Sequence, residues 1–231
     1  MNRPIYVVTL SIGILAAGCS THLYSPPARL APLESAATVG ADRTALQLEG
    51  GAGDAAWANI YFGTLRARHG FTDNLDGVME ANFLAFEDGH VAPSLRIGGK
   101  INIAKYLAFT GGVGAGTSSA GGFFSPDIGF IAAYENPYLV PFFSVRAWTS
   151  SPLGPRTLTL PNNDGDMPML QTYRPHFTFG DTWTLGMRLP IREEDGSSSV
   201  SLYGGFSFIH MVDAEKHDYG RSLNFGAEAT F

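Results

Sequence analysis

The sequence is poor in charged side chains, has one cysteine and contains no apolar run of transmembrane-helix length. Charged residues make up 16% of the 231 residues, with 15 Lys and Arg against 21 Asp and Glu, so the chain lacks the basic character typical of nucleic-acid binding. One cysteine excludes an internal disulfide framework and a thiolate metal cluster. The 28 Gly and 14 Pro disfavour a helical bundle, while 45% apolar residues suffice for a core. Many short strands remain as the natural interpretation.

The first residues follow the plan of a signal peptide. Met1 and Arg3 supply positive charge, and Ile5 to Ala17 form an apolar stretch of thirteen residues. At about 1.5 Å per residue this stretch spans roughly 20 Å, which is too short for a hydrocarbon core of about 30 Å. We therefore interpret residues 1–18 as a signal peptide, which places the mature chain outside the cytoplasm.

The junction Leu15-Ala16-Ala17-Gly18-Cys19-Ser20 resembles the lipobox of bacterial lipoproteins, in which small residues precede a cysteine that is lipidated and becomes the first residue. It departs from the family in having Ala16 three positions before the cysteine, where Leu is usual. The resemblance implies a lipid anchor on Cys19, and Ser20 in place of Asp implies export to the outer membrane. An ordinary signal peptide followed by an incidental thiol is the alternative.

Beyond Cys19 the pattern divides the chain into two regions. Residues 19–42 contain Pro26, Pro27 and Pro32 and show no period-two alternation, which predicts a flexible linker. Residues 43–231 alternate between apolar and polar side chains in segment after segment, which predicts strands.

The last segment shows the alternation most clearly. Leu223 and Phe225 lie on an apolar face that continues to the end of the chain, while Asn224 and Glu228 lie on a polar face. We predict ten strands, with eight as the alternative. Their approximate ranges are 44–52, 58–68, 76–86, 92–102, 106–116, 126–135, 139–149, 176–189, 199–210 and 221–231.

The composition of the polar faces separates a soluble barrel from a membrane barrel. In water, ten exposed strand faces need many Lys and Glu for solubility and to block edge pairing. Here the polar faces are mostly Ser, Gly, Asn and Thr, and the apolar faces carry many Phe and Leu. In hydrocarbon every backbone donor and acceptor needs an internal partner, so strands span only as a closed sheet. The sequence therefore predicts an all-β fold, an up-and-down antiparallel transmembrane β-barrel.

Two stretches, Arg68-His69-Gly70-Phe71-Thr72-Asp73-Asn74-Leu75 and the closing Leu223 to Phe231, resemble the hairpins and the terminal strand of small bacterial outer-membrane β-barrel proteins. The resemblance implies that Phe231 is an assembly signal read by the barrel-assembly machinery. An even strand count returns both barrel termini to the same side. If Cys19 is anchored in the inner leaflet, that side is the periplasm, and the long connection at residues 150–175 faces outward. The sequence names no partner for that connection.

Several charged side chains fall on the polar faces of the predicted strands. A barrel of eight strands is just filled by side chains and one of sixteen leaves a channel, so ten strands lie near the filled end. We therefore expect a mostly plugged lumen containing a charge network, with a narrow channel for small solutes as the alternative. The expected network consists of Glu49, Glu80, Arg96, Lys100, Arg146, Arg188 and Glu228.

The sequence predicts no catalytic residue, no metal site and no cofactor. The run Gly111 to Gly116 lacks the Lys-Ser/Thr of a phosphate loop and lies inside an alternating segment, and the six His residues have no metal-ligand spacing. A lipid-directed hydrolase or acyltransferase would need a Ser, or a pair of acidic residues, together with a His at the outer rim of the barrel. Those residue types occur without recognisable spacing at Ser125, Asp127, Ser150, Ser151, His176 and Asp181.

These features together predict an outer-membrane β-barrel lipoprotein that is not an enzyme and has a structural or loop-mediated surface role. Its expected partners are outer-membrane lipids and the barrel-assembly machinery, with no nucleic acid. Three alternatives stay open: a narrow channel, an outer-membrane lipid-modifying enzyme, and a periplasmic lipid-anchored barrel that binds an apolar ligand.

Overall fold

The computed structural model describes residues 23–55, 58–87, 90–156, 158–162, 169–173, 175–192, 199–214 and 216–231. The predicted signal peptide and the predicted lipid anchor at Cys19 lie outside these residues. No helix in the described part of the chain is long and apolar enough to cross a membrane. Its strands are β1 (Leu23–Tyr24), β2 (Thr44–Ala55), β3 (Ala58–Thr72), β4 (Leu75–Phe86), β5 (Val91–Ala104), β6 (Leu107–Ser118), β7 (Gly121–Ala133), β8 (Val140–Leu153), β9 (Leu158–Asn162), β10 (Met169–Tyr173), β11 (Pro175–His176), β12 (Thr178–Arg192), β13 (Ser199–Val212) and β14 (His217–Thr230).

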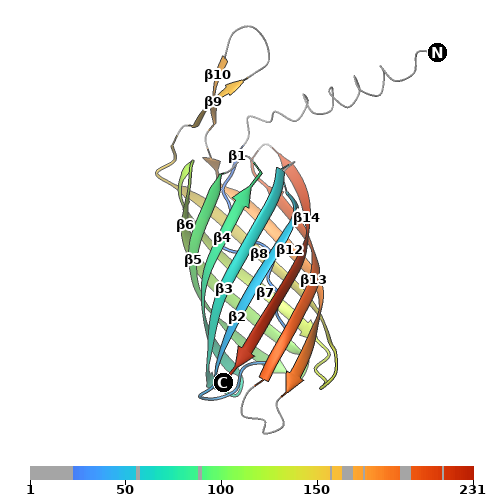
Figure 1. Ribbon diagram of the computed structural model, residues 1–231. Coiled ribbons are helices and arrows are strands. Elements are labelled where there is room, and N and C mark those ends of the chain that lie inside the picture. Colours follow the sequence, from blue (N-terminus) through green and yellow to red (C-terminus); the bar gives the residue numbers. More distant parts are fainter. Residues whose placement is uncertain are drawn as a thin grey trace, which may run out of the picture.

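Ten of these strands close into one antiparallel up-and-down barrel (Figure 1). Strands β2 to β8 follow one another around the barrel, β12 pairs with β8, and β12 to β14 complete the wall. The seam is the pairing of β14 with β2, from Gly220 opposite Ala55 to Thr230 opposite Ala45. The prediction of a closed all-β barrel of ten strands is confirmed. The other strands form a parallel β1–β11 pair and an antiparallel β9–β10 hairpin.

The two ends of the barrel differ in their connections. The lower end in Figure 1 holds Thr44 and Phe231, whose backbone groups exchange two hydrogen bonds of 3.2 and 2.8 Å. The strands at this end are joined by residues 73–74, 105–106, 134–139 and 193–198. At the upper end, β8 and β12 are joined by the longest connection, residues 154–177, which contains β9, β10 and β11. The shorter upper connections are residues 56–57, 87–90, 119–120 and 213–216.

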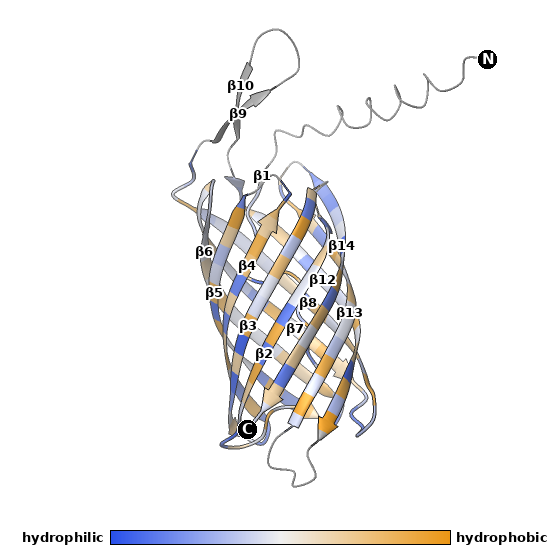
Figure 2. Ribbon diagram, viewed as in Figure 1, coloured by the Kyte–Doolittle hydropathy of each residue, from blue (hydrophilic) through white to orange (hydrophobic). Residues whose placement is uncertain are grey.

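Side-chain burial follows the alternation of the sequence, with the polar face inside. Along β14, Ser222, Asn224 and Glu228 are buried, whereas Leu223 and Phe225 are 56% and 65% exposed. Figure 2 shows the same exchange of hydrophilic and hydrophobic positions along the barrel strands. Among the described residues, the largest fully buried side chains include the four cations Arg66, Arg96, Arg146 and Lys100. This arrangement is the reverse of a protein folded in water.

The height of the wall matches a bilayer. The barrel strands have 12 to 15 residues. At about 3.3 Å per residue and a tilt of about 40°, such strands rise roughly 30 to 38 Å, against about 30 Å for the hydrocarbon core.

The region expected to be a flexible linker, residues 19–42, differs from that prediction where it is described. Residues 27–36 are all buried, because residues 24–39, named here the lumen segment, run through the inside of the barrel and not through solvent. The segment has no period-two pattern, since it forms almost no ladder with the wall. The backbone N–H groups of Ser25, Leu33 and Val39 donate instead to side chains that the strands point inward. The linker interpretation is therefore corrected for residues 24–39, which form a buried segment inside the barrel.

Candidate functional site

The lumen segment is fixed to strand ends where it enters at the upper end. The Ser25 N–H donates to Thr178 Oγ1 at 2.9 Å, and Ser150 Oγ donates to the Pro26 carbonyl at 2.7 Å. Thr178 begins β12 and Ser150 lies near the end of β8. Two neighbouring wall strands therefore hold the upper end of the segment.

At the lower end, where the segment leaves the barrel, hydrogen bonds again fix it to the wall. The Val39 N–H donates to the Asp76 carboxylate at 3.1 Å, and the Asp42 N–H donates to the Gly70 carbonyl at 2.9 Å. Asp76 is fully buried near the start of β4. From Ser25 to Val39 the segment thus crosses the whole lumen before the chain turns into β2.

Arg29 anchors the middle of the segment to the wall. Its guanidinium forms ion pairs with Glu80 of β4 at 2.7 Å, with Glu49 of β2 at 2.9 Å, and with Glu34 of the segment itself. The Arg29 side chain is 2% exposed. A buried guanidinium without partners costs several kcal/mol, so these three carboxylates are what allow a cation at this place.

Two wall arginines share the same carboxylates. Arg66 of β3 lies 2.5 Å from Glu49 and 2.8 Å from Glu80. Arg96 of β5 lies 3.2 Å from the second oxygen of Glu80. Both carboxylates are therefore held between the wall and Arg29, and four adjacent strands contribute to one network.

The network continues across the lumen through Asp127 of β7. Asp127 pairs with Arg96 at 2.6 Å and with Arg146 of β8 at 3.2 Å. Arg146 also lies 3.0 Å from Glu34 of the lumen segment. Glu34 and Arg29 together tie the segment to opposite parts of the wall.

A second group of charges lies closer to the lower end. Arg68 of β3 pairs with Glu228 of β14 and, at 3.2 Å, with Asp76 of β4. Lys100 of β5 lies 3.7 Å from Asp76 and donates to the Ala37 carbonyl of the lumen segment. The pair of Arg68 and Glu228 spans β2 and so joins strands on both sides of the barrel seam.

Arg188 is linked to the lower group through Tyr203, which contacts the Arg188 guanidinium and donates a hydrogen bond to Glu228 at 3.3 Å. Arg188 also pairs with Glu135, which lies in the lower connection between β7 and β8. The other Glu135 oxygen accepts a hydrogen bond from the Ala37 N–H at 3.0 Å. This connection therefore reaches the lumen segment as well.

All seven charged residues expected in the lumen point inward. Glu49, Glu80, Arg96 and Arg146 share the network around Arg29, Lys100 and Glu228 lie in the lower group, and Arg188 pairs with Glu135 beside that group. Sequence reasoning missed four wall residues that the same alternation could have found: Arg66, Arg68, Asp76 and Asp127. It also missed Arg29 and Glu34, for which the irregular pattern of the segment gives no signal.

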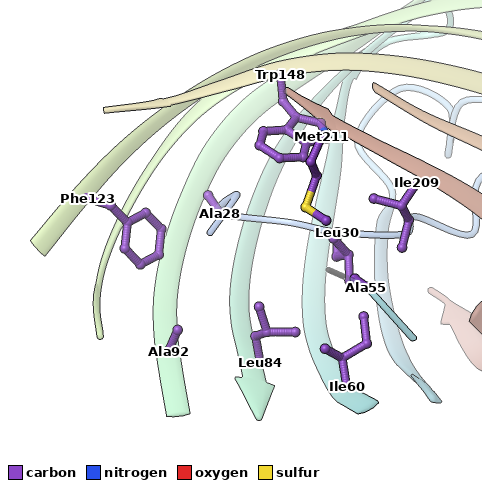
Figure 3. Packing of buried hydrophobic residues seen from close by; sticks show 10 residues of the cluster. All are labelled: Ala28, Leu30, Ala55, Ile60, Leu84, Ala92, Phe123, Trp148, Ile209 and Met211. Carbon is purple, nitrogen blue, oxygen red and sulfur yellow. The ribbon is translucent and has the colours of Figure 1, made fainter. Parts of the chain in front are cut away.

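Apolar side chains of the lumen segment pack above and below the charges. Ala28 and Leu30 belong to a buried cluster with Trp148, Ile209 and Met211 (Figure 3). The second cluster contains Leu33 and Ala36 of the segment, packed with wall residues Ala108, Ile131, Ala133, Val140, Phe142 and Tyr203. The plug is therefore held by burial as well as by ion pairs.

Glycines in the wall make room for the segment. A Cβ on Gly114 would lie 2.3 Å from the Ala28 Cβ, and a Cβ on Gly205 would lie 2.7 Å from a Leu33 methyl carbon. At the neighbouring Gly204, the nearest atom would be 4.0 Å away, on Phe225. The wall backbone therefore approaches the lumen segment closely at Gly205, which faces inward, and not at Gly204, which faces outward.

A small cavity borders the lumen segment. A cavity of about 10 Å³ lies next to Ala28 and Arg29, bordered by Phe62, Thr64 and Asn82. This is about the volume needed for one water molecule. The cavity offers no room for a solute or an apolar ligand.

Three of the residues considered for catalysis are engaged in other contacts. Asp127 lies between two arginines, and Ser150 donates to the Pro26 carbonyl. Asp181 lies on the opposite face of the wall from the lumen, 3.0 Å from His210 and 2.6 Å from the Trp183 indole nitrogen. Among the described residues, no group of three or more His, Cys, Asp or Glu is placed to hold a metal ion.

Solved structures of similar shape are β-barrel proteins of bacteria. The beta domain of the Bordetella autotransporter BrkA has a TM-score of 0.48 and 11% identity, covering 81% of this chain and 98% of that domain. The N-terminal β-barrel domain of Pseudomonas aeruginosa OprF has a TM-score of 0.36 and 12% identity, covering 83% and 99%. The KdgM porin has a TM-score of 0.36 and 6% identity, covering 80% and 97%. No protein-family model and no curated protein matches the sequence.

Proposed function

We propose that this protein is an outer-membrane β-barrel lipoprotein whose lumen is closed by its own N-terminal segment. It acts structurally or through its upper connections, and it is not an enzyme. One observation carries the proposal: the lumen segment fills the barrel from end to end and is tied to the wall by buried ion pairs.

The outer surface of the barrel supports a membrane location. Large apolar side chains face outward along the strands, among them Leu48 at 65%, Leu95 at 69% and Ile128 at 65% exposure. In water such a continuous apolar surface would drive association. In a bilayer it meets hydrocarbon, and the closed ladder leaves no unpaired sheet edge.

The packed lumen also bears on the alternatives. A channel needs a continuous opening, and a barrel that binds an apolar ligand needs an apolar cavity; the interior instead holds charged groups, two apolar layers and a cavity of about 10 Å³. A lipid-modifying enzyme needs a nucleophile or an acid beside a base at the rim; Ser150 instead donates to the Pro26 carbonyl, and Asp181 lies beside His210 on the outer face of the wall.

Conductance in planar bilayers tests the closed lumen. The wild-type protein should conduct far less than a porin. The double variant Arg29→Ala, Glu34→Ala removes both charges of the lumen segment and should open more often, because the segment loses its ion pairs to β2, β4 and β8. The matched control is Asp54→Ala, Arg221→Ala, which removes an ion pair whose side chains are 44% and 70% exposed. Porin-sized conductance of the wild type would contradict the proposal.

Acyl labelling tests the lipid anchor. Cells given a labelled fatty acid should incorporate it into the wild-type chain and not into Cys19→Ala, because Cys19 is the only cysteine. The variant barrel should still show heat-modifiable migration. An unlabelled wild-type protein would rule out the anchor while leaving the barrel itself in place.

A further inference from the structure

The first described residues lie at the opposite end of the barrel from the start of its wall. Leu23 and Tyr24 pair with Pro175 and His176 in the upper connection. Thr44, where β2 begins, is hydrogen-bonded to Phe231 at the lower end. Between them the chain passes once through the lumen, so the two ends of residues 23–44 lie on opposite sides of the membrane that the barrel spans.

The connections indicate which side is which. Bacterial outer-membrane barrels have short turns on the periplasmic side and longer loops on the outside. One upper connection, residues 154–177, has 24 residues, whereas the other four upper connections have two to four residues and the lower connections have two to six, so the assignment rests on this one long connection. The upper end is therefore the outer face.

Cys19 cannot reach the lower leaflet from this position. It precedes Leu23 by four residues, which span at most about 14 Å when fully extended. The hydrocarbon core is about 30 Å thick. Cys19 also has no path to the lower leaflet through the lumen, because residues 24–39 and the side chains that contact them occupy it.

We propose that the lumen segment carries the chain from the cell surface to the periplasmic face, so that the N-terminal end of the mature protein is displayed outside. This inference rests on the outer-membrane barrel proposed above. The four-residue reach from Leu23 then predicts that acyl chains on Cys19 would enter the outer leaflet and not the inner one.

The protein crosses the membrane without exposing its charges to hydrocarbon. Arg29 and Glu34 lie inside the wall, paired to Glu49, Glu80 and Arg146. The wall strands that supply these partners follow the lumen segment in the sequence. The segment therefore enters the barrel in one of two ways. It is in place before β14 pairs with β2, or it is drawn through the lumen before the inward side chains have packed.

Labelling of single cysteines in intact cells tests the topology. A membrane-impermeant maleimide is applied to the unsubstituted chain, whose one cysteine is Cys19, and to full-length variants that each add one cysteine, and label at the added cysteine is counted above that baseline. The variants are Thr21→Cys near the N-terminal end, Ser119→Cys in an upper connection, and Lys105→Cys in a lower one. The last two positions are exposed. Heat-modifiable migration checks that each variant folds, and acyl labelling of the same samples reports the anchor.

Thr21→Cys should label in intact cells to the same extent as Ser119→Cys, while Lys105→Cys should label only after the outer membrane is permeabilised. Protection of Thr21→Cys together with Lys105→Cys, while Ser119→Cys reacts, would overturn the inference and leave the barrel intact. Equal labelling of Ser119→Cys and Lys105→Cys in intact cells would overturn the spanning barrel and the inference with it. Surface labelling of Thr21→Cys without acyl label would support the topology and remove only the lipid.

Discussion

Glu228→Ala should destabilise the barrel strongly, because it removes one partner of a buried ion pair beside the seam. The side chains of Arg68 and Glu228 are 8% and 4% exposed. Breaking such a pair costs about 3–5 kcal/mol. Arg68 keeps Asp76 at 3.2 Å, so we expect about 3 kcal/mol, the lower end of that range. With about 2–4 °C per kcal/mol for a domain of this size, the heat-modification midpoint should fall by roughly 6–12 °C.

Asp54→Ala is the matched control. Asp54 also belongs to an ion pair at the seam, with Arg221 at 3.0 Å, but these side chains are 44% and 70% exposed. Exposed pairs contribute about 0.2–1 kcal/mol, so the midpoint should move little. Glu228→Gln keeps a hydrogen-bond acceptor for Arg68 and should fall between the two. Equal midpoints for Glu228→Ala and Asp54→Ala would refute a stabilising role for the lower charge group.

Two further substitutions test the close contact with the plug and the lipid-facing surface. Gly205→Ala should lower the heat-modification midpoint by the equivalent of about 1–3 kcal/mol through overpacking, because the new Cβ would lie 2.7 Å from Leu33 and 3.1 Å from the Leu185 carbonyl. Gly204→Ala, on the outer face, should be close to neutral. Equal effects of the two substitutions would argue against a lumen segment packed against Gly205. Leu48→Arg, at a position 65% exposed near the middle of β2, should cost about 2–4 kcal/mol when measured by urea unfolding in vesicles. Tyr138→Arg is the control, because Tyr138 is 80% exposed in a lower connection; near the membrane–water interface it should cost about 0–1 kcal/mol. An equally small cost for Leu48→Arg and Tyr138→Arg would mean that the apolar surface faces water.

The wall could be predicted from the sequence because each of its strands repeats one simple rule. Period-two alternation places Leu95 and Ile97 on one side and Arg96 on the other, and the structure has the first two exposed and the third buried. The same rule located the seven inward charges, and it would have located Arg66 and Arg68 had it been applied to every position of the second strand.

The plug could not be predicted in the same way. An irregular segment within a lumen is not constrained by strand pairing, so Pro26, Pro27 and Pro32 read as a linker. Its position depends on partners far along the chain, such as Thr178, which accepts from Ser25 over 153 residues. The ion pairs could not be predicted from the sequence either, although periodicity shows that Glu228 and Arg188 face inward. Glu228 pairs with Arg68 because of the register of the barrel strands. Arg188 pairs with Glu135 because the connection that holds Glu135 bends inward.

The charged lumen has a physical role beyond holding the plug. Buried ion pairs are often no more stabilising than well-packed apolar residues, so the network is poorly explained as a source of stability alone. A slip of one residue in strand pairing exchanges the two faces of a strand. For β5 such a slip would turn Arg96 and Lys100, now 1% and 2% exposed, toward lipid. A cation costs about 2–4 kcal/mol near the bilayer midplane and less toward the interfaces, so one misaligned strand would lose at least about 2–4 kcal/mol for Arg96 alone, in addition to its ion pairs. The charges thus select the register in which the polar faces enclose a common lumen, and that register is also the one that places Glu49 and Glu80 where Arg29 of the lumen segment can reach both.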